Sequence, residues 1–292
     1  MATSQPSNGA AAAIGEQELA EIYAFAVQVA KDAGALLMKA QKESSVDIVT
    51  ETDMNIEAFI HQSITARYPT HKFIGEESYS QGSDKRYLVD DAPTWIVDPL
   101  DGTVNFAHLF PMVCISIGFT INGHPVVGVI NAPILNQMVS ACRGRGAWLN
   151  ETQRLPLVHD PIPRSPKTRP GAASSQLGGR GGKGGMAHGV RSLGSAAMGL
   201  AYAAMGSVDI WMEGGCWEWD VAGGIAILEE AGGFVTTANP PGDPETCEIP
   251  KVRLGGRLPA GASEKETALE AQQRVVREAF SEVPQSYMAL ST

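Results

Sequence analysis

The chain has 292 residues, of which 43% are hydrophobic and 18% are charged, a balance that allows a sizeable core and argues against global disorder. Its 22 Lys and Arg against 32 Asp and Glu give a formal net charge of −10, which disfavours nucleic acid and anionic membranes as partners and favours metal cations. The four cysteines form no CxxC pair, which disfavours a zinc ribbon. No apolar run reaches about 18 residues, so no membrane span is predicted.

The order of predicted elements follows from apolar periodicity and from the positions of Gly and Pro. The predicted helices lie at 16–41, 54–68, 192–205, 221–231 and 263–280. The predicted strands lie at 72–75, 94–97, 113–121, 126–131, 138–142, 208–212 and 234–237, with a loop at 78–93 and turns at 122–123 and 131–133. Helices and strands mix without strict alternation, so we expect an α/β (α+β) fold with largely antiparallel sheets in a layered sandwich.

One segment has no periodicity at all. Residues 160–190 contain four prolines and eight glycines, which remove ladder donors and raise the entropy cost of ordering. We therefore predict a linker at 159–190 that sustains neither strand nor helix, so that the sheet of the second half lacks a strand and exposes an edge. It divides a metal-binding half, 16–158, from a second half, 191–285, that completes the site. Residues 1–15 lack Lys and Arg and are predicted to be a disordered tail rather than a targeting peptide, which makes the cytoplasm the expected compartment.

The most informative segment is Asp98–Pro99–Leu100–Asp101–Gly102–Thr103, which directly follows an apolar strand. Two carboxylates three residues apart on a tight turn can converge on one point, and Gly102 allows close approach of the backbone to a ligand. Thr103 stands where a helix can begin, with its N–H groups directed at an anion. Carboxylate and carbonyl oxygens are the ligands that Mg²⁺ prefers.

Further acids occur at the ends of other elements. Glu76 and Glu77 follow the strand at 72–75, while Asp53 and Asp220 each open a helix. Each alone is an ordinary turn residue or a first-turn acid favoured by the helix dipole. Their joint occurrence favours one shared pocket for several metal ions.

These motifs resemble a known family. DIVTETD (47–53), FIGEES (73–78), WIVDPLDGTVNF (95–106) and WDVAGG (219–224) are similar to the inositol monophosphatase family, within the lithium-sensitive, magnesium-dependent phosphatase superfamily. The wording EGGCWEWDVAGG also resembles a fungal branch associated with the quinate pathway. The resemblance implies a five-layered αβαβα sandwich of the sugar phosphatase type, two or three Mg²⁺ ions, inhibition by Li⁺ and a homodimer.

The resemblance also implies roles for single residues. Metal ligands would be Glu76, Asp98, the carbonyl of Leu100, Asp101 and Asp220. The catalytic residues would be Asp53 and Thr103, which orient and deprotonate the attacking water within hydrogen-bond reach of each other, and Glu76. The substrate would contact Gly102, Thr103, Gly194, Ser195, Ala196, Glu213 and Asp220. Lys42 resembles a basic residue near the site, with an ordinary surface lysine as an equal alternative.

The sequence favours a small polyol monophosphate, with inositol monophosphate as the leading substrate. Residues 192–250 are poor in Lys and Arg, whereas a second phosphate would require a basic cluster. A nucleotide would require an aromatic or Arg platform, and Trp211, Trp217 and Trp219 are predicted to be core residues. The open alternatives are a 3′-nucleotidase, a fructose bisphosphatase and a non-catalytic regulatory paralogue.

Overall fold

The computed structural model describes residues 14–42, 48–82, 89–158, 172–173, 189–213, 215–237, 254 and 287–290. Its largest element is a seven-stranded sheet in the order β1-β2-β3-β4-β5-β6-β7. These strands are Lys72–Gly75, Thr94–Asp101, Cys114–Ile121, His124–Ala132, Gln137–Cys142, Ala147–Leu149 and Gln153–Arg154. Only the β1–β2 pair is parallel, and every other pair in this sheet is antiparallel. The prediction of a largely antiparallel α/β fold is therefore confirmed.

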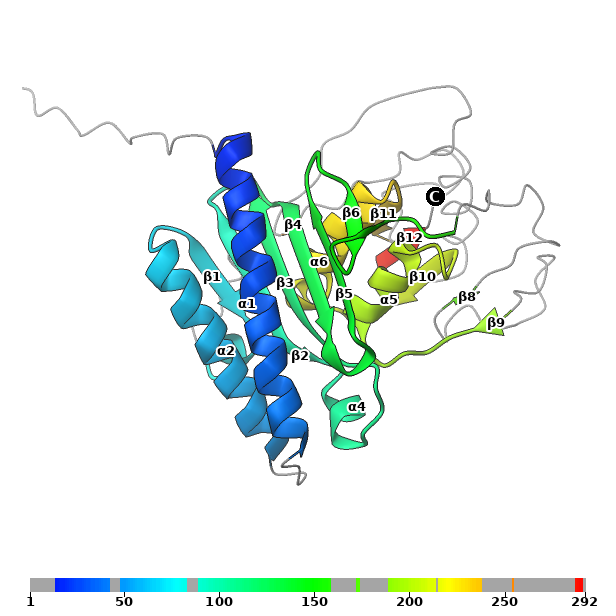
Figure 1. Cartoon of the computed structure of the whole chain (residues 1–292), viewed down its shortest axis with the longest axis horizontal. Coiled ribbons are helices and arrows are strands. Elements are labelled where there is room, and N and C mark those ends of the chain that lie inside the picture. The colour runs from blue at the N-terminus through cyan, green and yellow to red at the C-terminus, as the bar shows by residue number, and fades with distance from the viewer. Residues whose placement is uncertain are drawn as a thin grey trace, which may run out of the picture.

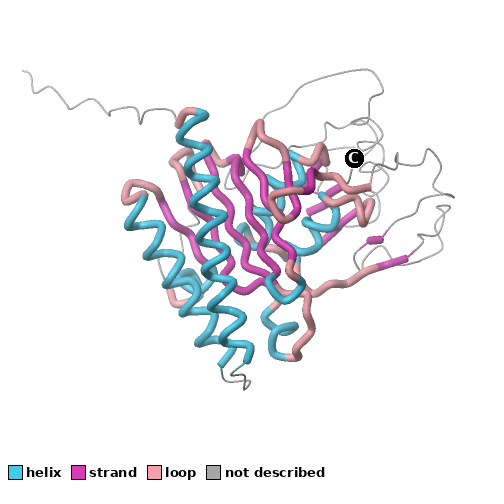
Figure 2. The backbone as a smooth tube through the Cα atoms, viewed as in Figure 1, coloured by secondary structure: helices cyan, strands magenta, loops and turns pink. Residues whose placement is uncertain are grey.

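The sheet is covered on both faces, so its central strands are buried along almost their whole length. Helices α1 (Glu16–Lys42) and α2 (Ile48–Arg67) cover one face, and α6 (Glu218–Glu230) lies behind it (Figures 1 and 2). Alternate residues of β2 point to opposite faces of the sheet: Trp95 packs in the core beneath α1 and α2, and Ile96 packs in the core beneath α5 and α6. Helix α5 (Ala196–Ala204) completes the second helical layer.

A second, smaller sheet forms the next layer. Its strands, in the order β10-β12-β11, are Ile210–Glu213, Tyr287–Leu290 and Phe234–Thr237, and both pairings are antiparallel. The described residues thus provide four layers of the expected sandwich. The helix predicted at 263–280 lies outside the described residues, as do residues 1–13 of the predicted tail.

Two glycines let α6 approach the large sheet closely. A Cβ atom added to Gly128 would lie 2.0 Å from the carbonyl oxygen of Gly223 in α6. A Cβ on Gly118 would lie 2.6 Å from the Cβ of Ala222. Because backbone atoms cannot rotate away as a flexible side chain can, α6 must shift if either glycine gains a side chain.

We expect Gly128→Ala to lower the free energy of unfolding by about 3 kcal/mol, the upper part of the range for overpacking a core. Chemical denaturation would measure this change. Gln153→Ala, on the exposed edge strand β7, is the matched control and should change it by no more than about 0.5 kcal/mol. Equal stabilities of Gly128→Ala and the unaltered protein would mean that α6 does not pack this closely.

The structure corrects several predicted boundaries. Helix α2 begins at Ile48, so Asp53 lies in its second turn and does not open it. A short helix, α3 (Glu76–Ser80), replaces the start of the loop predicted at 78–93. Strand β2 continues through Asp101, with a register shift between Asp98 and Asp101 in place of the predicted turn directly after the strand.

Other differences lie in short elements that depend on pairing partners. The two-residue strands β7, β8 (Ala172–Ala173) and β9 (Gly189–Val190), with β6 and β12, were not predicted. Strands β8 and β9 pair in parallel, although no strand was expected in that segment. Most of the segment predicted as a linker, 159–171 and 174–188, lies outside the described residues.

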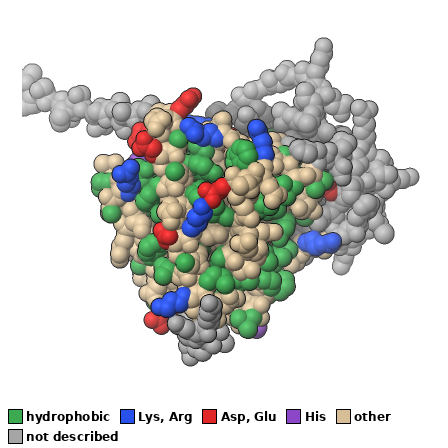
Figure 3. Space-filling view, viewed as in Figure 1, with side chains coloured by type: hydrophobic (Ala, Val, Ile, Leu, Met, Phe, Trp, Pro, Cys, Tyr) green, Lys and Arg blue, Asp and Glu red, His purple; other side chains and the backbone are tan. Residues whose placement is uncertain are grey.

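None of the described helices combines the length and apolar character needed to cross a bilayer. On the face crossed by α1, basic and acidic side chains are interspersed and neither sign gathers into a patch (Figure 3).

Candidate active site

The end of β2 presents two buried carboxylates. Asp98 and Asp101 are only 1% and 8% exposed. Oδ1 of Asp98 accepts a hydrogen bond from the backbone N–H of Leu100 at 2.9 Å, which closes the irregular stretch of strand on itself. Helix α4 (Thr103–Ala107) begins at Thr103, as predicted from the sequence.

Gly102 makes this arrangement possible. Its φ of 95° lies in the left-handed region, and a Cβ atom here would lie 2.7 Å from the carbonyl oxygen of Met112. Only glycine satisfies both constraints without strain. The packing of the loop itself therefore requires glycine here, and the predicted approach of the Gly102 backbone to a ligand stays a prediction.

Asp101 joins the two halves of the chain. Its Oδ2 accepts hydrogen bonds from the hydroxyl of Ser195 at 2.6 Å and from the backbone N–H of Ala197 at 2.7 Å. The side-chain amide of Asn105 adds a second link by donating to the carbonyl of Leu193 at 2.7 Å. The predicted substrate segment 194–196 therefore lies against the predicted metal-binding turn.

Two further acids reach the same place from α3 and α6. Glu76 is the first residue of α3, and Asp220 lies in the first turn of α6, where its Oδ2 accepts from the backbone N–H of Trp217 at 2.7 Å. Burial raises the pKa of both Glu76 and Asp220, and a hydrogen bond to Asp98 lowers each pKa in part. Asp98 therefore lies between these two acids.

Glu57 on α2 fixes the start of α3, a role that sequence reasoning missed. Glu57 is only 4% exposed. Its carboxylate accepts hydrogen bonds from the backbone N–H groups of Glu77 and Ser78, at 2.8 Å each, and from the Ser78 hydroxyl. These are N–H groups that the helix cannot satisfy itself. Glu57 is thus a tertiary cap that orients Glu76.

We expect Glu57→Ala to lower the free energy of unfolding by about 2 kcal/mol, because it leaves half-buried donors of α3 without an acceptor. Glu51→Ala, an exposed position on the same helix, is the control and should change it by less than about 0.5 kcal/mol. Urea titration of the two variants would measure the difference. An equal, small effect in both would remove Glu57 as the cap of α3.

Asp53 is buried near these acids, but the predicted hydrogen bond to Thr103 is not formed. Oδ1 of Asp53 has no hydrogen-bond partner, and the residue is 2% exposed. The Thr103 hydroxyl instead donates to the carbonyl of Leu100 at 3.2 Å. A hydroxyl has one proton to donate, so this hydrogen bond within its own turn takes the place of the expected one to Asp53.

Burial and mutual repulsion make this a cluster of weak acids. Burial is the largest cause in every case, and it raises the pKa of Asp53 to about 8, of Glu76 and Asp101 to about 7 and of Asp220 to about 6. The pKa of Asp98 is raised well above its usual value by burial, and next by the charges of Asp101 and Glu76. Within the part of the chain that the structure describes, no basic side chain is a leading cause of these five pKa shifts.

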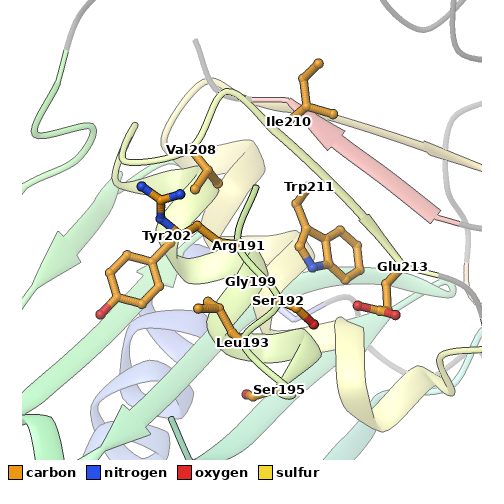
Figure 4. A pocket seen from close by; sticks show the side chains of 10 residues that line it. All are labelled: Arg191, Ser192, Leu193, Ser195, Gly199, Tyr202, Val208, Ile210, Trp211 and Glu213. Atoms are coloured by element: carbon orange, nitrogen blue, oxygen red, sulfur yellow. The ribbon is translucent and has the colours of Figure 1, made fainter. Parts of the chain in front are cut away.

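Glu213 and Ser195 line a small pocket that is partly open to solvent. Trp211 and Glu213 lie on one side of it, Arg191 and Tyr202 lie on the other, and Ser195 lies at one end (Figure 4). Because Ser195 also binds Asp101, the pocket adjoins the acidic cluster. The two predicted substrate residues Gly194 and Ala196 flank Ser195, and Lys42 ends α1 with a side chain outside the described set.

The donor set suits a hard cation. A buried carboxylate oxygen without a hydrogen-bond partner, among acids whose charges raise one another's pKa, is favourable only when protonated or when a cation is bound. As they stand, the described His, Cys, Asp and Glu side chains form no group of three arranged to hold an ion. Several carboxylate oxygens instead accept protein hydrogen bonds, as Asp101 does from Ser195 and Ala197.

Comparisons with known proteins decide the family. The model of the inositol monophosphatase family matches residues 18–277. The chain belongs to this family. It is 54% identical to "Quinic acid degradation cluster protein x" of Neurospora crassa, over 91% of this chain and 94% of that protein. It is 42% identical to inositol monophosphatase 2 of Saccharomyces cerevisiae, over 68% of this chain and 72% of that protein.

Solved structures agree with the fold. An inositol monophosphatase from Anabaena (Nostoc) is 28% identical and superposes with a TM-score of 0.66, over 92% of this chain and 98% of that one. Membership of the inositol monophosphatase family confirms the resemblance drawn from the four motifs. The family consists of phosphoric monoester hydrolases, so the chain is an enzyme of this class.

Proposed function

We propose that the enzyme hydrolyses the monophosphate ester of a small polyol with the help of Mg²⁺, and that inositol monophosphate is the leading substrate. The observation that carries this is the cluster of the buried Asp53, Asp98 and Asp101 with the half-buried Glu76 and Asp220, which draws on both halves of the chain and in which burial raises the pKa of every member. Such a cluster in a phosphatase suits binding of cations and, through them, of a phosphate.

We assign the metal ligands to the residues around the end of β2. Glu76, Asp98, Asp101, Asp220 and the carbonyl of Leu100 would hold two or three Mg²⁺ ions. Bound Mg²⁺ would supply positive charge to the phosphate and lower the pKa of water. Hydrogen bonds from Ser195 and Ala197 keep Asp101 oriented when the protein binds an ion, because they occupy only its Oδ2 atom.

The remaining residues would bind and orient the reactants. Backbone N–H groups of Gly102 and Thr103 would donate to the phosphate. Asp53 and Thr103 would orient the attacking water from two sides, with Asp53 as the proton acceptor; a water between them would replace the direct bond that is not formed. Glu213 and the segment 194–196 would contact the hydroxyl groups of the polyol from the adjoining pocket.

A monophosphate fits the charge of the second half better than a bisphosphate. Arg191 is the only Lys or Arg in the sequence from 189 to 237, whereas a second phosphate is usually bound by several cations. This weighs against a fructose bisphosphatase. The full set of acids weighs against a non-catalytic paralogue.

Phosphate release from inositol 1-phosphate, with Mg²⁺ or with EDTA, tests the proposal. We expect release only with Mg²⁺, and inhibition of that release by Li⁺. Because the relative from Neurospora crassa is named for a quinic acid degradation cluster, the panel should include a phosphate ester of a hydroxylated cyclohexane carboxylic acid. No release from any ester in the presence of Mg²⁺ would favour the non-catalytic alternative. We also propose a cytoplasmic homodimer, which light scattering and imaging of a tagged chain would test.

A further inference from the structure

Ser116 on β3 carries a buried hydroxyl that the fold itself does not use. The residue is 0% exposed, and within the described part of the chain its Oγ has no hydrogen-bond partner. The hydroxyl of Ser140, another fully buried serine of the same sheet, is paired with the hydroxyl of Tyr23 at 2.9 Å. Because an unpaired buried hydroxyl is unfavourable in a folded protein, the stability of the fold does not explain Ser116.

The register of the large sheet places Ser116 beside Asp98. The two residues are directly opposite each other in the antiparallel β2–β3 pair. Their side chains therefore point to the same face of the sheet, with Cβ atoms about 4.5–5.5 Å apart. This face is the one beneath α5 and α6, since Ile96 and Cys114, two positions before them, pack in that core. At this spacing a serine hydroxyl can reach the carboxylate of the opposite residue.

Helix α6 encloses the Ser116 hydroxyl from the other side. A Cβ atom added to Gly223 would lie 3.0 Å from Oγ of Ser116. Gly223 is three positions after Asp220, and residues three apart are neighbours on the surface of a helix. The unpaired hydroxyl thus lies between the strand that carries Asp98 and the helical turn that carries Asp220, next to the acidic cluster.

We propose that Ser116 is a positioning residue, whose hydroxyl donates a hydrogen bond to the Asp98 carboxylate when the site holds its cations and so fixes the orientation of that carboxylate. This rests on the proposed function. A charged carboxylate has about four lone-pair sites, and on Oδ1 the N–H of Leu100 occupies one of them. A hydrogen-bond partner behind a metal ligand fixes how the ligand is turned toward the ion. Ser116 itself contacts neither the substrate nor the cations.

Calorimetric titration with MgCl₂ measures this role without any substrate. Loss of a partner that orients a metal ligand typically costs about 10- to 100-fold in metal affinity, and we expect Ser116→Ala to raise the Kd for Mg²⁺ by this factor. Ser116→Cys, which has a weak S–H donor in place of the hydroxyl, should have an intermediate Kd. In EDTA, Ser116→Ala should be at least as stable to urea as the unaltered protein, because it removes an unpaired buried polar group.

Ser140→Ala is the matched control, because it makes the same substitution at a buried serine whose hydroxyl is paired. It should lower the stability in EDTA and leave the Kd for Mg²⁺ unchanged, the reverse of Ser116→Ala. An unchanged Kd in Ser116→Ala would overturn the positioning role alone. A clear loss of stability of Ser116→Ala in EDTA would also overturn it, because the hydroxyl would then have a partner within the fold. If the unaltered protein binds no Mg²⁺, the metal assignment of the proposed function fails, and the role of Ser116 fails with it.

Discussion

The Asp98→Asn variant should lose at least about 10³-fold in kcat/KM, which corresponds to about 4 kcal/mol of transition-state stabilisation. The reason is its position. The Asp98 carboxylate is buried, is affected by the charges of Asp101, Glu76 and Asp220, and is the side chain that both Glu76 and Asp220 approach. Asparagine keeps the shape of the side chain but removes the charge that a shared cation requires. Phosphate release at saturating Mg²⁺ would measure the loss.

The same variant should fold at least as well as the unaltered protein in EDTA. Replacing one acid of a repelling cluster removes a cost of burial, so an inactive variant with normal or higher stability would locate the defect in metal binding. Asp32→Asn, an exposed acid on α1, is the matched control and should keep full activity. Activity of Asp98→Asn at the unaltered rate, with unchanged Mg²⁺ dependence, would mean that the metal assignment is wrong.

The parts of the site that the sequence predicted are those whose signal is local. An apolar strand, two acids three residues apart and a following glycine all lie within 94–103, so their convergence needs no distant partner. The strands up to Cys142 were likewise predictable, because Asn122 and Gly123 form the expected turn with φ of 54° and 71°. Helix α4 at Thr103 follows from the same short segment.

The parts that were missed depend on residues far apart in the chain. The hydrogen bond from Ser195 to Asp101 joins residues 94 positions apart. The hydrogen bond that Glu57 accepts from the N–H of Glu77 joins residues 20 positions apart. Strand β12 forms from four residues near the end of the chain because β10 and β11 lie on either side of it. Trp217 shows the same limit, because its residue type predicts a core position and only the packed structure reveals that it is 46% exposed.

Mg²⁺ should stabilise the folded protein much more at pH 8 than at pH 5. The cluster acids have folded-state pKa values raised to about 6 to about 8, above the value near 4 of an unfolded chain. A raised pKa stabilises the folded state fully below the unfolded value, and this stability is lost as pH rises through the folded value. Without metal, stability should therefore fall between about pH 4 and about pH 8, because the carboxylates become charged and repel one another.

Bound Mg²⁺ should reverse this trend, since it requires the same carboxylates in their charged form. A ligand at a concentration of 100 times its Kd raises the free energy of unfolding by about 2.7 kcal/mol. For a chain of this size, that corresponds to a rise in Tm of roughly 5–10 °C. We expect a rise of this size at pH 8 and almost none at pH 5, measured by thermal unfolding against NaCl of equal ionic strength. Asp98→Asn should lose most of the rise at pH 8, whereas Asp32→Asn should keep it. A Tm increase of equal size at both pH values would show that Mg²⁺ binds elsewhere, because a site made of these weak acids must couple its affinity to pH in this range.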